Sequence, residues 1–135
     1  MNIASNPKTV RKPGGAYSHA VRVPSDAEWL VISGQVGVSP DGKLAQGVRK
    51  QTEQVYKNLL ACLRENGMRK QDLVKFTVYL TDSRYIEEYR AARKKIIGDD
   101  VLPTSTLVIV EGLAAPDMLV EIEAWAAKSP AQRDR

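Results

Sequence analysis

Hydrophobic and polar positions alternate along the chain with two different periods, and these periods predict its elements. Alternation with a period of two favours strands over residues 16–23, 29–36 and 72–80. Residues 46–66 repeat apolar positions at helical spacing, and Asn66-Gly67 follows as a helix C-terminus requires. Behind Asp82-Ser83, which can cap a helix, a shorter and more polar helical pattern extends to Gly98.

The closing stretch, residues 102–126, predicts two strands joined by a Gly/Pro loop, which we expect to form a hairpin. Glu121 and Glu123 stand two positions apart in an otherwise apolar run. In a strand both carboxylates point to one face, beside Trp125. A carboxylate in such a place must be solvated, paired or used in chemistry.

The resulting order of elements is strand, strand, helix, strand, helix, strand, strand. This order predicts an α+β fold in which a mostly antiparallel sheet carries both helices on one face. The apolar side of the 72–80 strand should meet the helices. The opposite sheet face is expected to be a mixed surface suited to an oligomer interface, formed by Lys75, Thr77, Tyr79, Glu121, Glu123 and Trp125.

Length and composition predict one domain, since 135 residues with 43% hydrophobic content can build a single core. We expect an N-terminal arm without secondary structure over residues 1–12, a domain over 13–127 and a C-terminal tail over 128–135. The sequence contains no apolar run long enough to span a membrane and no signal-peptide pattern, so a cytoplasmic protein is expected.

Charge and rare residues exclude several classes of function. The formal net charge of +4 is scattered along the chain, which argues against a nucleic-acid-binding surface. Cys62 is the only cysteine and His19 the only histidine, so no metal site is expected. Cys62 falls on the apolar side of a helical pattern and is expected to be a buried, inert thiol.

Ser33-Gly34 interrupts a predicted strand. Such a glycine either contacts a ligand or allows close packing against a neighbouring strand.

Several motifs taken together resemble those of the RidA/YjgF/YER057c/UK114 family of reactive-intermediate deaminases, also called endoribonuclease L-PSP. The similarity covers about residues 13–127. The motifs are Gly15-Ala16-Tyr17, Ile32-Ser33-Gly34-Gln35-Val36, the helix 51–66, Val74-Lys75-Phe76-Thr77-Val78-Tyr79-Leu80, Leu102-Pro103 and Val120-Glu121-Ile122-Glu123-Ala124.

The resemblance implies a chorismate-mutase-like fold, a homotrimer with clefts between subunits, and hydrolysis of enamines and imines to carbonyl compounds and ammonia without a cofactor. By resemblance, Tyr17, Ser33 and Gly34 would line the cleft. Glu121 would hold the attacking water. These residue types suit the chemistry, because a carboxylate can deprotonate water and backbone N–H groups can bind substrate oxygens.

One position departs from the family pattern. Deaminating members carry an arginine two residues after the proline of the fourth strand, where its planar fork binds the substrate carboxylate. Here that position is Ser105, and losing the charge-assisted bond would weaken such a substrate about tenfold to a hundredfold. Arg90 on the second helix is a candidate substitute that could reach the cleft, or it is a solvated helix residue. His19 is a weaker candidate.

Three functions therefore remain open at this point. The first is a divergent imine or enamine hydrolase with a non-standard substrate preference. The second is a non-catalytic trimer that binds a small metabolite in the same clefts. The third, a ribonuclease or translation inhibitor, follows only from the family label, since the chain lacks the pair of histidines typical of RNA cleavage.

Overall fold

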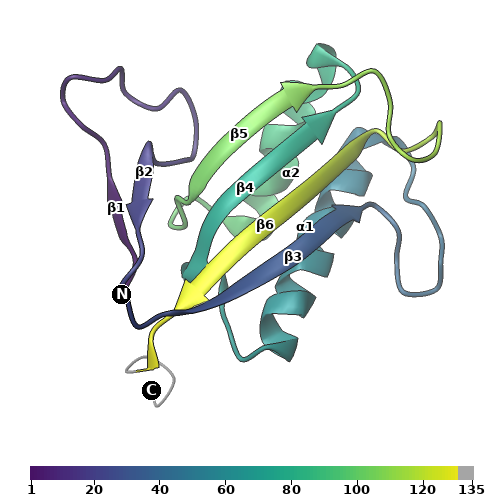
Figure 1. Cartoon of the computed structure of the whole chain (residues 1–135). Coiled ribbons are helices and arrows are strands. Elements are labelled where there is room, and N and C mark those ends of the chain that lie inside the picture. Colours follow the sequence, from purple (N-terminus) through teal and green to yellow (C-terminus); the bar gives the residue numbers. More distant parts are fainter. Residues whose placement is uncertain (131–135) are drawn as a thin grey trace.

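The computed structural model describes residues 1–130 and shows a four-stranded sheet with both long helices on one face (Figure 1). The α+β class is therefore confirmed. The elements in chain order are β1 (Ile3–Ser5), β2 (Ala20–Arg22), β3 (Glu28–Val36), α1 (Gly47–Glu65), the 3-10 turn η1 (Lys70–Asp72), β4 (Leu73–Leu80), the 3-10 turn η2 (Ser83–Tyr85), α2 (Ile86–Ile97), β5 (Thr104–Ile109) and β6 (Val120–Lys128).

The core lies between the helices and the sheet. Alternate residues of β4 are buried against the helices, as expected: Val74, Phe76, Val78 and Leu80. From α1, Val55, Leu59 and Leu63 are also buried, one helical turn apart. Gly67 has a φ of +69°, a conformation that favours glycine, and it ends α1 close to the predicted position.

The strand order is β3-β6-β4-β5, so the expected hairpin of the two closing strands is wrong. β4 lies between them: β5 pairs with β4 in parallel, and β6 pairs antiparallel with both β4 and β3. The α2 crossover explains this, because a helix between two strands lets them pair in parallel. The loop between Ile109 and Val120 then carries the chain past β4 to β6.

The N-terminal region differs from expectation in two ways. Ile3–Ser5 forms the short strand β1 and pairs with β2, so the arm contains an element. The strand expected over 16–23 shortens to Ala20–Arg22 and stays outside the main sheet. The cause is that Ser18 is bound elsewhere: its N–H donates to the Pro103 carbonyl (3.1 Å) and its hydroxyl to the Leu102 carbonyl (2.7 Å).

The last strand reaches the first residue of the expected C-terminal tail. β6 ends at Lys128, whose Nζ donates to the Gly67 carbonyl at 3.1 Å, so the expected tail begins within the last strand. Residues 131–135 of that tail lie outside the described residues.

The sheet face away from the helices carries the mixed surface that the sequence predicts. The strand register places Lys75 opposite Trp125, Thr77 opposite Glu123, and Tyr79 opposite Glu121. Apolar side chains extend this face onto β3, where Val31 is 60% exposed in the single chain. Trp29 and Trp125 meet edge to face with ring centroids 5.8 Å apart. We call this surface the open sheet face.

Candidate functional site

A β-bulge brings Gly34 directly beneath the carboxylate of Glu121. The pairing of β3 with β6 shifts between Ile32 and Gln35, so Ser33 and Gly34 together oppose the single residue Glu123. A Cβ atom on Gly34 would lie 2.0 Å from Oε2 of Glu121. Glycine is therefore required here by the close approach of the carboxylate. The sequence motifs 32–36 and 120–124 thus meet at one place in the structure.

Replacing Gly34 by alanine should displace the Glu121 carboxylate while leaving the fold intact. The clash falls mainly on the end of a flexible side chain, which can move away. If Glu121 activates water, a shift of about 1 Å should lower turnover by about a hundredfold with little change in melting temperature.

The matched control is Gly112→Ala, because a Cβ on Gly112 meets no atom within 4 Å. Thermal melting and steady-state rates of both variants test the prediction. Full activity of Gly34→Ala would contradict it.

Glu123, unlike Glu121, is hydrogen-bonded to a neighbouring side chain. The Tyr79 hydroxyl donates a hydrogen bond to Oε1 of Glu123 at 2.8 Å, and this bond to the carboxylate raises the pKa of Tyr79. Glu123 is thus held by its neighbour on β4. The side chain of Glu121 makes no hydrogen bond or ion pair within residues 1–130, so its carboxylate remains available.

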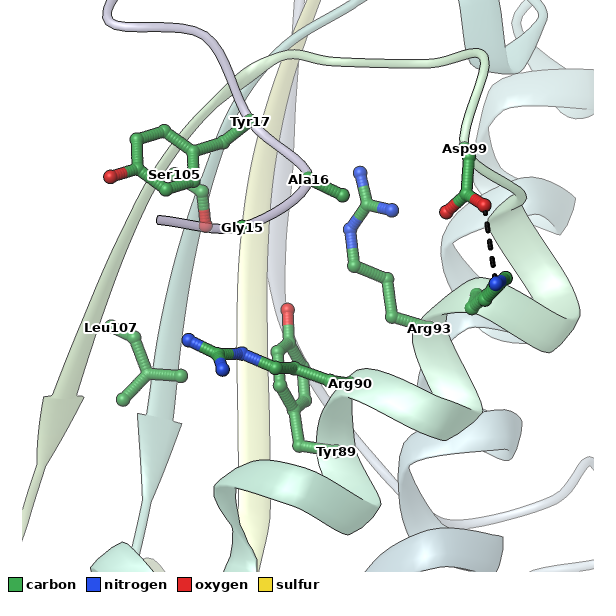
Figure 2. Close-up of a pocket in the computed structure, with 10 residues that line it drawn as sticks. Gly15, Ala16, Tyr17, Tyr89, Arg90, Arg93, Asp99, Ser105 and Leu107 are labelled. Atoms are coloured by element: carbon green, nitrogen blue, oxygen red, sulfur yellow. Dashed lines mark ion pairs between the residues drawn. The ribbon is translucent and has the colours of Figure 1, made fainter. Parts of the chain in front are cut away.

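A separate pocket of about 300 Å³ brings Tyr17, Arg90 and Ser105 together (Figure 2). Gly15, Ala16 and Tyr17 from the segment before β2, four residues of α2, two of β5 and Asp99 line it. Figure 2 shows the Arg90 side chain extending from α2 toward Leu107 of β5. Three of the site residues expected from the sequence therefore share one cavity.

The other charges of this pocket are already partnered. Arg93 is 5% exposed, and its guanidinium donates to the carbonyls of Gly98 (3.0 Å) and Val101 (2.9 Å). These bonds hold the connection that leads from α2 to β5. The Nζ of Lys94 lies 3.5 Å from the Asp99 carboxylate. Their opposite charges cancel within the pocket wall.

Tyr89 also lines the pocket but is largely buried. Its hydroxyl lies 2.6 Å from that of Tyr56 in the core, and burial raises the pKa of both phenols. Both hydroxyls therefore stay neutral and serve structure. Tyr89 and Arg93 fall at helical spacing with Ile86 and Ile97 in the sequence, and an arginine on that side of α2 is the signal from which its burial could have been predicted.

The pocket residue Ser105 and the carboxylate of Glu121 lie on opposite faces of the sheet. Ser105 is in register with Phe76, which is fully buried beneath the helices. Glu121 is in register with Tyr79 on the open sheet face. Since side chains alternate between faces, one chain cannot bring Ser105 and Glu121 together.

The remaining candidates are His19 and Cys62. The His19 ring nitrogen Nε2 contacts the Arg11 carbonyl, and the ring meets Tyr17 edge to face, with centroids 5.8 Å apart. His19 therefore links the end of the arm at Arg11 to Tyr17. Cys62 packs against the core but is only half-buried, so its expected full burial is wrong. Within residues 1–130, no three His, Cys, Asp or Glu side chains are grouped as a metal ion would need.

Comparison with known proteins decides the family. Over residues 8–128 the chain matches the family model described as Endoribonuclease L-PSP. The chain belongs to this family. An endoribonuclease L-PSP relative, a RutC family protein from Aquifex aeolicus, is 38% identical over 118 residues, which cover 86% of this chain and 91% of the relative. The resemblance to RidA-type proteins is thus confirmed.

Solved structures of the endoribonuclease L-PSP family share the fold. A Rid-family protein of unknown function from Yersinia pestis superposes with a TM-score of 0.80 at 31% identity, covering 94% of this chain and 98% of that one. RidA from the Antarctic bacterium Psychrobacter sp. superposes with a TM-score of 0.70 at 32% identity, covering 86% of this chain and 91% of that one.

No helix within residues 1–130 has the length and apolar character of a membrane span.

Proposed function

We propose that the protein is a cofactor-independent hydrolase that converts reactive imines and enamines to carbonyl compounds and ammonia. The observation that carries this proposal is the unpaired Glu121 carboxylate above the Ser33-Gly34 bulge. The bulge removes the backbone of Ser33 and Gly34 from the ladder with β6, which makes their N–H groups candidates for binding substrate oxygens. Membership of the RutC and RidA family supports the same assignment.

The reaction needs one general base and one water molecule. Glu121 takes a proton from water while the water oxygen bonds to the imine carbon, which gives a tetrahedral carbinolamine. The protonated carboxyl then returns the proton to nitrogen. The carbinolamine hydroxyl then gives its own proton to Glu121, which passes it to the nitrogen, so the oxygen forms the C=O bond as the C–N bond breaks and ammonia leaves. An enamine first takes up a proton on carbon to become the imine, so no oxidant or reductant is required.

The proposed site needs two subunits, because Ser105 and Glu121 occupy opposite faces of one chain. In the homotrimer that we propose, the pocket of one subunit would adjoin the Glu121 of its neighbour. The open sheet face supports this assembly: Trp29, Val31 and Trp125 are all substantially exposed in the single chain. Burial of the apolar surface that these side chains still expose would stabilise such an interface.

Val31→Glu should convert the trimer to monomers, because it buries an unpaired charge in the centre of the apolar part of this face. Analytical ultracentrifugation should report the monomer mass of 14.9 kDa in place of three times that value. Ala61→Glu is the matched control, since Ala61 is exposed on α1, in the opposite layer of the molecule. A Val31→Glu protein that stays trimeric would exclude the open sheet face as the interface.

The decisive experiment is ammonia release from freshly generated 2-aminoacrylate and from imines of uncharged compounds, compared between wild type and Glu121→Ala. Catalysed release that depends on Glu121 supports the hydrolase. Ligands that raise the melting temperature but are recovered unchanged would instead favour a metabolite-binding trimer. RNA degradation by the wild type that is lost in Glu121→Ala would instead support the ribonuclease hypothesis.

A further inference from the structure

Arg90 is the one cation of the pocket whose charge is only weakly compensated. Its sole side-chain partner within residues 1–130 is Glu87, with Nη1 of Arg90 and Oε1 of Glu87 3.3 Å apart. The Glu87 side chain is 86% exposed and that of Arg90 55% exposed. Exposed pairs of this kind contribute little, so water or a ligand can replace Glu87 at small cost.

The small side chain of Ser105 leaves room in the pocket for the Arg90 guanidinium. Position 105 faces the helix side of the sheet and lines the same cavity of about 300 Å³ as Arg90. An arginine at position 105 would place a second unpaired guanidinium there, and the two like charges would repel each other. The serine adds instead a hydroxyl that makes no hydrogen bond within the described chain.

We propose that Arg90 determines ligand specificity by binding the carboxylate of a small organic acid from the α2 side of the pocket. The planar fork of arginine fits a carboxylate, and the Ser105 hydroxyl can donate a further bond. Arg93 and the Lys94–Asp99 pair hold their own partners, so the pocket offers one site for a single negative charge.

The rest of the wall limits the kind of acid. The Nε of Arg90 lies 4.0 Å from the place that a Cβ on Gly15 would occupy, so the backbone at Gly15 closes one side of the guanidinium. Leu107 and the ring of Tyr17 add apolar surface. The ligand is therefore a short acid with a small apolar substituent. For turnover this inference rests on the proposed hydrolase function, whereas ligand binding can be tested without it.

The test is an NMR titration at constant ionic strength of the full-length protein, in its solution assembly, with pyruvate and with uncharged methyl pyruvate. Pyruvate should bind the wild type more tightly than the ester. Arg90→Gln should weaken pyruvate binding about tenfold to a hundredfold and leave the ester unchanged. Glu87→Gln, which removes the competing carboxylate, should strengthen pyruvate binding about twofold.

Lys95→Gln is the matched control. It removes the same charge from the same helix, but Lys95 pairs with Glu53 of α1 (3.1 Å) and does not line the pocket. The proposal is overturned if wild-type protein fails to bind pyruvate, if Arg90→Gln binds it normally, or if Lys95→Gln loses as much affinity.

Failure of this inference and failure of the proposed function give different results. Arg90-dependent pyruvate binding without any ammonia release would refute the hydrolase and keep the role of Arg90. Ammonia release from 2-aminoacrylate with an unchanged KM in Arg90→Gln would keep the hydrolase and refute the role of Arg90.

Discussion

Glu121→Gln is expected to lower the rate of ammonia release from 2-aminoacrylate by about 100-fold to 10,000-fold. Glutamine has nearly the same shape and can still orient water, but it cannot accept the proton that water loses during attack on the imine. The loss should fall on kcat, since Glu121 contributes to the reaction step. Steady-state kinetics with freshly generated substrate measure the effect.

Glu123→Gln is the control for this prediction. Glu123 stands two positions further along the same face and accepts the Tyr79 hydroxyl, so the change has the same chemistry at a partnered carboxylate. Its rate should stay within about threefold of wild type, because the amide oxygen can still accept that bond. Equal losses in both variants would show a general effect of charge on the open sheet face and would remove Glu121 from the mechanism.

The faces of the helices and strands could be predicted from the sequence because side-chain direction follows the period of the pattern. Alternation along β4 identified Phe76 and Val78 as core residues, and both are fully buried. The same alternation predicted that Tyr79 and Glu121 share one sheet face, which the register confirms. Such statements need only local geometry, since each residue's face follows from its neighbours.

The strand order could not be read in this way, because it depends on contacts between distant segments. The loop after β5 looked like a hairpin connection, yet β4 pairs with both β5 and β6. From this order it follows that Ser105 and Glu121 lie on opposite faces. The role of Arg90 could not be predicted from the sequence for the same reason. Only the packing of α2 beside β5 brings Arg90 and Ser105 into one cavity.

A buried glutamine near the start of α1 supports the proposed site in a way that no motif indicated. Gln51 is 2% exposed, and its amide nitrogen donates to the carbonyls of Ala45 (3.1 Å) and Asp117 (2.9 Å). Its amide oxygen accepts the N–H of Leu119 at 2.9 Å. One side chain thus ties the loops on both sides of the site to the helix, and Leu119 lies two residues before Glu121.

Gln51→Leu should destabilise the protein by about 2–4 kcal/mol, because it leaves three partly buried backbone groups without their partners. Turnover should fall as well, since the loop that leads into Glu121 loses its attachment to α1. Urea unfolding at one fixed protein concentration measures the first effect, and kcat of the folded fraction measures the second.

Lys50→Leu is the control for Gln51→Leu, because it introduces the same side chain at the exposed neighbouring position of α1. Its stability should change by less than about 0.5 kcal/mol. A Gln51→Leu protein with wild-type stability would mean that the two loops hold their positions without this side chain. Full activity in a destabilised Gln51→Leu protein would separate the stability of the loops from the placement of Glu121, and the carboxylate would then be positioned by β6 and the Gly34 bulge alone.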